Sequence, residues 1–195
     1  LTVAGAWAQD GLYAPVRPDE TALVRLIHVN PAANAAPVTI DVGTVRWRDV
    51  AAQSGTAYRA VRPGVYVIMA YGHRMALTAT TGTFYSVVLA PSGITTFSDT
   101  YHDDPLRAQV VLYNLTEYPA SLDAVIPEGV LLESVDAGGS QHQVINAIPV
   151  TLAASLLPGN GEAGPAGAPD HERGAIGRYE VALRLERGAS YGIVI

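Results

Sequence analysis

The sequence predicts an all-β protein of two tandem antiparallel β-sandwich domains related by internal duplication, and three observations lead to this prediction. Short runs rich in Val, Ile, Thr and Tyr alternate with turn residues such as Asn30-Pro31 and Arg62-Pro63-Gly64, without a sustained helical period. The order of these runs recurs in the second half of the chain. A sandwich domain takes about 100 residues, so a chain of 195 residues accommodates two.

The first half contains six runs that we expect to form strands. None of them shows the 3.6-residue period of an amphipathic helix, and β-branched and aromatic residues favour a pleated, half-buried surface. The expected strands cover residues 22–29, 38–42, 57–61, 65–70, 75–80 and 84–89.

Three segments of the first half have counterparts in the second. Val24 aligns with Val110 (offset 86), Val65 with Val150 (offset 85) and Gly82 with Gly188 (offset 106). The jump in the offset coincides with a Gly- and Pro-rich stretch that cannot hold a strand, so we expect a loop insertion there. The expected divisions are a first domain at 9–102, a linker at 103–106 and a second domain at 107–195 with its insertion at 158–177.

Residues 1–8 resemble the end of a signal peptide. An apolar stretch closes on Ala6-Trp7-Ala8, an A-x-A cleavage pattern, before the polar Gln9. This pattern predicts a secreted protein, most simply in a bacterial periplasm, whose mature form begins at Gln9. The alternative is a short first strand. No other stretch approaches the roughly 18 apolar residues of a membrane span.

Composition excludes several classes of function. The net charge is −6 and the 12 basic residues are scattered, which argues against nucleic acid as a partner. The chain has no cysteine, so disulfides, thiolate metal sites and a cysteine nucleophile are excluded.

A catalytic site has one candidate in the sequence. Asp99 and His102 have the D-x-x-H spacing in which a carboxylate orients an imidazole that activates a serine. The matching Gly-Asp-Ser nucleophile block and a G-x-S-x-G elbow are absent. We therefore expect no catalytic residues, and an acetyl esterase or acetyltransferase is the enzymatic alternative.

Metal ions and cofactors are not expected either. Two acidic triplets carry suitable ligand types, residues 102–104 and 170–172. Consecutive residues seldom converge on one ion, however, because neighbouring side chains of an extended chain point in opposite directions. Solvated loops are the simpler interpretation of both triplets.

The candidate binding residues surround one tryptophan and the linker. In a strand, Arg46 and Arg48 lie on the face opposite Trp47, so either the indole is in the core and the arginines are exposed, or the reverse. Exposed arginines would suit a carboxylated polymer or an acidic partner. The full set of partner-binding or glycan-binding candidates is Arg46, Trp47, Arg48, Tyr101 and His102.

Three segments also resemble a known family. Gly11-Leu12-Tyr13-Ala14-Pro15, residues 22–29 and residues 110–115 are similar to the AlgF family of periplasmic accessory proteins. A weaker resemblance is to DUF4397-like β-sandwich domains of exported and surface proteins. Neither resemblance includes a site motif whose residues can be transferred to this chain.

The AlgF resemblance implies a non-catalytic adaptor required for O-acetylation of an exopolysaccharide such as alginate. Its partners would be periplasmic O-acetyltransferases and a membrane O-acyltransferase, and the polysaccharide itself is a further candidate. The sequence does not identify the polymer, since a relative required for acetylation of cellulose would show the same sequence pattern. The alternative function is a periplasmic or surface carbohydrate-binding module.

Overall fold

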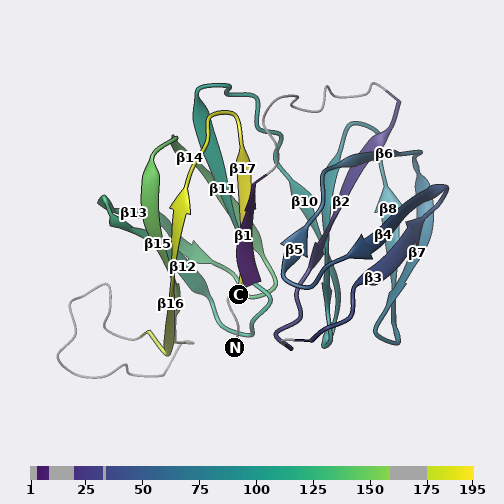
Figure 1. Ribbon diagram of the computed structural model, residues 1–195, viewed down its shortest axis with the longest axis horizontal. Helices are drawn as coiled ribbons and strands as arrows, with labels where there is room; N and C mark the ends of the chain where they lie inside the picture. The colour runs from purple at the N-terminus through teal and green to yellow at the C-terminus, as the bar shows by residue number, and fades with distance from the viewer. Residues whose placement is uncertain (1–3, 9–19, 33, 159–174) are drawn as a thin grey trace.

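The computed structural model describes residues 20–32, 34–158 and 175–195, together with the backbone of residues 4–8. These residues form strands and no helix, so the all-β prediction is confirmed (Figure 1). It follows that no described helix could cross a membrane. Most of the predicted insertion, residues 159–174, lies outside the described residues, and β16 begins at Gly177.

The first half consists of two layers around a hydrophobic core. The strands are β2 (Ala22–His28), β3 (Val38–Val42), β4 (Val45–Val50), β5 (Ser54–Gly55), β6 (Arg59–Val61), β7 (Gly64–Ala70), β8 (His73–Ala79), β9 (Phe84–Ala90) and β10 (Gly93–Asp99). One layer is the sheet β10-β9-β2-β5, to which β6 adds by pairing with β2. The other is made of the hairpins β3-β4 and β7-β8. Three of these strands, β4, β5 and β10, were not among the expected runs.

The second half repeats this plan with two four-stranded sheets. Its strands are β11 (Arg107–Tyr113), β12 (Ala120–Ile126), β13 (Glu128–Val135), β14 (Ser140–Asn146), β15 (Pro149–Leu156), β16 (Gly177–Arg184) and β17 (Ser190–Val194). The sheets have the orders β1-β17-β11-β14 and β13-β12-β15-β16, where β1 is Ala4–Ala8. Residues 4–8 thus form a short strand, which was the alternative to the end of a signal peptide. Export of the protein stays a prediction.

The two halves share unusual backbone features at equivalent positions. In each, the first long strand runs parallel to a later one: Leu23 pairs with Phe84 in β2-β9, and Gln109 pairs with Ser190 in β11-β17. Each half also has a tyrosine-corner arrangement, in which the Tyr85 hydroxyl meets the Thr80 amide and the Tyr191 hydroxyl meets the Glu186 amide. These matches follow offsets of 86 and 106 and agree with duplication, which remains a prediction.

One segment of the sequence alignment needs a correction. The offset of 85 aligns Val65 with Val150, but Val65 is 70% exposed and Val150 is buried. In the hairpin ladders, Val65 pairs with Thr78 and Pro149 pairs with Arg184. Thr78 and Arg184 are related by the offset of 106, so their partners Val65 and Pro149 occupy equivalent positions. A one-residue slip exchanges the two faces of a strand, which explains why the alignment was wrong there.

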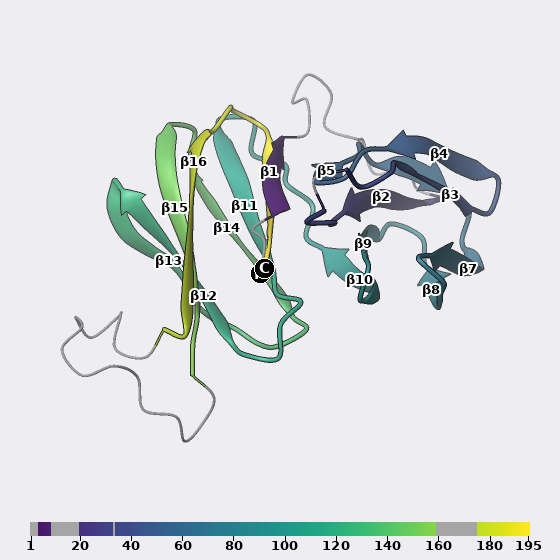
Figure 2. The ribbon, with the colours of Figure 1, turned by 60° about the horizontal axis from the view of Figure 1, so that its bottom comes forward.

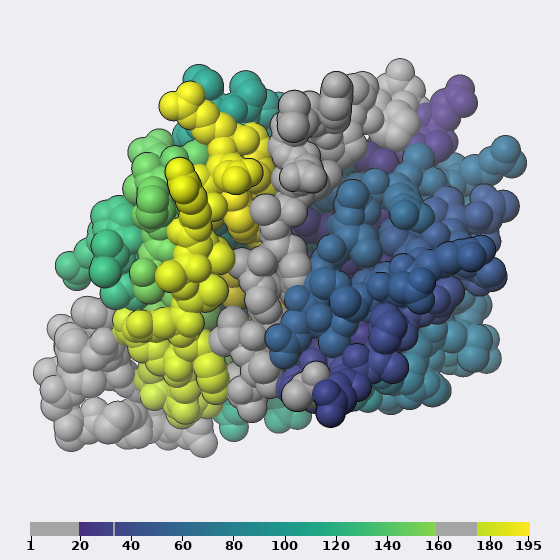
Figure 3. All heavy atoms as spheres, in the orientation of Figure 1, coloured from purple at the N-terminus to yellow at the C-terminus, as the bar shows by residue number. Residues whose placement is uncertain are grey.

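The parallel strands are buried on both faces because the two halves pack against each other through them. Every residue of β2, β9 and β17 is buried. The side chains on one face of these strands fill the core of their own half, and those on the other face pack against the opposite half. This double burial explains their nearly continuous apolar composition. The two halves lie side by side (Figures 2 and 3).

A third hydrophobic cluster joins the halves. It contains Ile27, Val88 and Phe97 from the first half and Val111, Tyr113 and Val194 from the second. The strands approach closely where β17 has no side chain: a Cβ on Gly192 would lie 3.2 Å from the Tyr113 ring and 3.9 Å from Ile27. The linker has a defined turn, because the Asp104 carboxylate accepts hydrogen bonds from the backbone amides of Leu106 and Arg107.

Candidate functional site

A buried polar network lies where the two halves meet, and we call it the Asp99 cluster. Arg25 comes from β2, Ser86 from β9, Asp99 from the end of β10 and Tyr58 from the segment before β6, all in the first half. Tyr113 of β11 is the contribution of the second half. The side chains of Arg25 and Asp99 are only 6% and 4% exposed.

Two hydroxyl groups bridge the opposite charges of the cluster. Ser86 Oγ accepts from Arg25 Nε at 2.7 Å and donates to Asp99 Oδ2 at 2.5 Å. Tyr113 OH accepts from Arg25 Nη2 at 2.6 Å and donates to Asp99 Oδ1 at 2.6 Å. The direct Arg25 Nε to Asp99 Oδ2 distance is 3.9 Å. The buried charges are thus paired mainly through hydroxyls, which satisfies the demand of buried ions for hydrogen bonds.

Aromatic rings close the cluster from the sides. Tyr58 donates its hydroxyl proton to Asp99 Oδ2 at 2.5 Å, while its ring centroid lies 4.7 Å from the Arg25 guanidinium carbon. Phe84 packs edge-on against Tyr58 at 5.2 Å and tilted against Tyr101 at 5.1 Å. These contacts exclude water, which strengthens the electrostatic interactions inside.

Burial perturbs the titration of these groups. It raises the pKa of Tyr113 and of Tyr58 above that of a free tyrosine, because a buried phenolate next to Asp99 is unfavourable, although Arg25 opposes the shift. For Arg25, burial by itself lowers the pKa, but the interactions with Tyr113, Tyr58 and Asp99 outweigh it and keep the guanidinium charged.

These shifts predict alkaline unfolding. A group whose pKa is higher in the folded than in the unfolded chain stabilises the fold below the unfolded pKa, here about 10, and that contribution is lost as the pH rises further. We expect the free energy of unfolding to fall steeply above pH 10, and Tyr113→Phe to make that fall shallower. Urea unfolding at pH 8, 10 and 11, with tyrosinate absorbance, measures both. Tyrosines that all titrate near pH 10 in the folded protein would contradict the prediction.

The hydrogen bonds of the Asp99 cluster link the first half to Tyr113 of the second half. Ser86 is completely buried and its hydroxyl already makes bonds to Arg25, Asp99 and Tyr113. Among the described residues, the side chains that bond to Ser86 include no imidazole that could take its proton. Sequence reasoning missed Arg25 and Ser86. The available signal was an arginine within the otherwise apolar strand ALVRLIH, where a buried charge requires a partner.

A second buried polar group escaped the sequence analysis as well. His28 is fully buried, and its Nδ1 hydrogen bonds to the Val50 carbonyl at 2.9 Å, so Nδ1 carries the proton. Its Nε2 then accepts a hydrogen bond from the Tyr71 hydroxyl. Tyr71 has a positive φ of 52°, a conformation that non-glycine residues seldom adopt. The imidazole thus anchors the β7-β8 turn to β2.

The tryptophan candidate lies in the core, and its neighbouring arginines are outside. Trp47 is 1% exposed, and its indole nitrogen has no hydrogen-bond partner among the residues that the structure describes. Arg46 and Arg48 are exposed on the opposite face of β4. Arg46 binds Asp41 through two hydrogen bonds of 2.6 and 2.7 Å, which hold the pKa of Asp41 below its usual range. The core alternative is therefore the one that the structure shows.

The linker candidates do not come together as a catalytic pair. Asp99 bonds to Tyr58, Ser86 and Tyr113, whereas His102 Nε2 bonds to the Arg107 carbonyl at 3.0 Å. Tyr101 packs against Phe84. Among the described residues, no three His, Asp or Glu side chains are grouped so that they could hold a metal ion. The 170–172 triplet lies outside the described residues.

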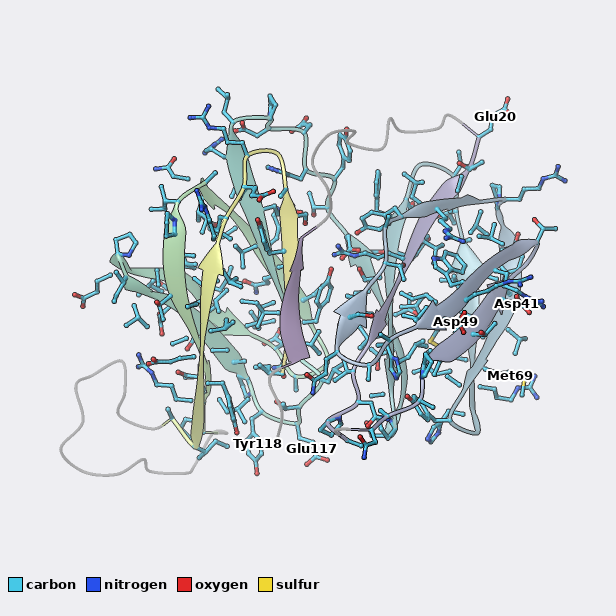
Figure 4. All side chains as sticks on the ribbon, viewed as in Figure 1. Glu20, Asp41, Asp49, Met69, Glu117 and Tyr118 are labelled. Atoms are coloured by element: carbon cyan, nitrogen blue, oxygen red, sulfur yellow. The ribbon has the colours of Figure 1, made fainter. Side chains whose placement is uncertain are left out.

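An apolar groove of about 520 Å³ opens beside the hydrophobic cluster that joins the halves. Val29 and Ala90 line it from the first half, and Leu115 and Val194 from the second. Glu117 and Tyr118 also line it and lie at the lower end of the molecule in Figure 4.

Comparison with known proteins identifies the family. The model of the family described as alginate O-acetyl transferase AlgF matches residues 1–176. The chain belongs to the AlgF family. The description of this family refers to alginate O-acetylation. A search of curated proteins finds no match.

One solved structure with a similar chain trace is the Bacillus anthracis TIE protein. The similarity covers 90% of the AlgF chain and 33% of the TIE chain, with 9% sequence identity and a TM-score of 0.31. The AlgF chain thus spans about a third of that protein's length.

Proposed function

We propose that this AlgF protein is a non-catalytic periplasmic adaptor that holds periplasmic O-acetyltransferases and a membrane O-acyltransferase together during O-acetylation of an alginate-like exopolysaccharide. The family description contains the word transferase, so the non-catalytic role needs its own support. That support is the Asp99 cluster: its serine, its carboxylate and Tyr113 are buried and bonded to each other across the two halves.

A rigid pair of sandwiches suits an adaptor. The hydrophobic cluster and the Asp99 cluster together fix one half against the other, so surfaces on both halves keep a constant spacing. Partners bound to different halves would then be held in a defined relation. The carbohydrate-binding alternative loses its leading aromatic candidate, because buried Trp47 cannot stack on a sugar.

Genetic complementation with a catalytic control tests the proposal. We expect deletion of the gene to abolish acetylation of the exported polymer, and both wild type and His102→Ala to restore it. Purified wild type and His102→Ala should hydrolyse a chromogenic acetyl ester at equal, negligible rates. Normal acetylation in the deletion strain would refute the adaptor role, and hydrolysis that depends on His102 would show an enzyme. Binding of alginate oligosaccharides in titration calorimetry would favour the carbohydrate-binding alternative.

A further inference from the structure

The outward face of β7 is apolar where a sandwich strand is normally polar. Val65, Val67 and Met69 are 70%, 50% and 66% exposed, while the alternate residues of β7 turn toward the core. We call these three residues the β7 stripe. Figures 1 and 2 both place β7 and β8 at the end of the molecule farthest from the second half. Contiguous exposed apolar residues of this kind mark interaction sites.

Arg74 lies on β8, the strand paired with β7, and further arginines lie on β4, beyond the adjacent strand β3. In the β7-β8 ladder, Val67 faces Ala76 and Met69 faces Arg74, both exposed. Hairpin β3-β4, in the same layer, presents the exposed Arg46, Arg48 and Asp41. Met69 and Asp41 project from the same outer side of the molecule (Figure 4). Strands β3, β4, β7 and β8 carry three arginines and two aspartates, whereas the whole chain has a net charge of −6.

The second half provides an internal control for the stripe. By the hairpin ladders, Val65, Val67 and Met69 correspond to Pro149, Thr151 and Ala153 of β15. On the predicted duplication, the equivalent strand therefore lacks large apolar residues at these three positions, and Ala153 is buried where Met69 is exposed.

We propose that the β7 stripe, together with Arg74 beside it and Arg48 farther across the same layer, forms the docking face for a protein partner that presents an apolar patch edged by carboxylates. This inference rests on the proposed adaptor function and names the surface that performs it. Interfaces of this type have an apolar centre and a polar, charged rim.

Other occupants fit the surface less well. A symmetric second copy would set the same arginine-bearing surface against itself. An anionic membrane would find no exposed aromatic side chain within the stripe to anchor it.

Binding measurements with matched variants test the docking face. The stripe variant is Val65→Thr/Val67→Thr/Met69→Gln, which keeps residues suited to a strand. The charge variant is Arg48→Glu/Arg74→Glu. The control is Ile126→Thr/Val130→Thr, which changes two similarly exposed apolar residues of the second half, at 66% and 61%. The probes are the purified periplasmic O-acetyltransferases of the same alginate system.

We expect the stripe variant to weaken binding at least about tenfold, as loss of hot-spot residues does. The charge variant should weaken it as well and remove most of its salt dependence. The control should bind like wild type, and all variants should keep the wild-type unfolding midpoint. Stripe and charge variants that bind like wild type would overturn the docking face while leaving the adaptor function intact. A wild-type protein that binds no probe would overturn both.

Two further measurements separate the other occupants. Sedimentation of the protein alone would reveal a dimer, and co-sedimentation with vesicles of phosphatidylcholine and phosphatidylglycerol would reveal membrane binding. We expect a monomer and no vesicle binding. Dimerisation or vesicle binding that the stripe variant abolishes would overturn the proposal.

Discussion

Replacing Asp99 with alanine is expected to lower the free energy of unfolding by about 3–5 kcal/mol, because it leaves the buried charge of Arg25 without its counter-ion. Three hydroxyls, from Tyr58, Ser86 and Tyr113, lose their acceptor in the same step. Urea unfolding followed by circular dichroism measures the loss. Since Tyr113 belongs to the second half, we also expect weaker contact between the halves, detectable as increased proteolysis at the linker.

A double-mutant cycle provides the control for this prediction. Arg25→Met alone should cost less than Asp99→Ala, because the remaining carboxylate keeps its three hydroxyl donors. The double variant Arg25→Met/Asp99→Ala should lose clearly less stability than the sum of the single variants, since it leaves no unpaired buried charge. Additive losses would mean that the two residues act independently and that the hydroxyl bridges do not couple them.

The sequence predicted the fold better than the site. Alternating and apolar runs fix the fold, which is why residues 38–42 coincide with β3 and the parallel strands stand out as continuous apolar segments. β10, with its sequence GITTFSD, lacks that signature because most of its residues are half-buried. Its omission hid the fact that Asp99 ends a strand.

The Asp99 cluster could not be read from the sequence because its members are far apart in the chain. Arg25 and Tyr113 are 88 positions apart, and only the packing of one half on the other joins them. Local spacing instead drew attention to Asp99 and His102, which are close in sequence but bond to different partners. Spacing identifies sites built within one loop or strand, and this network is built between strands.

Replacing Trp47 with alanine is expected to destabilise the fold by about 3–5 kcal/mol, the usual cost of deleting a large buried aromatic side chain. The indole lies in the core of the first half, in register with Ile40 of β3. Arg48→Ala, at the next position, should change the free energy of unfolding by no more than about 0.5 kcal/mol, because Arg48 is exposed. Urea unfolding of the two variants measures the contrast.

Trp47→Phe separates packing from hydrogen bonding at the same position. The indole N–H has no partner in the core, so phenylalanine removes an unsatisfied donor while keeping most of the apolar volume. Its cost should therefore be well below that of alanine. A Trp47→Ala variant with wild-type stability but impaired partner binding would contradict the core role and return Trp47 to the binding surface. Impaired binding in Arg48→Ala at unchanged stability would instead support the contribution of Arg48 on β4 to the docking face.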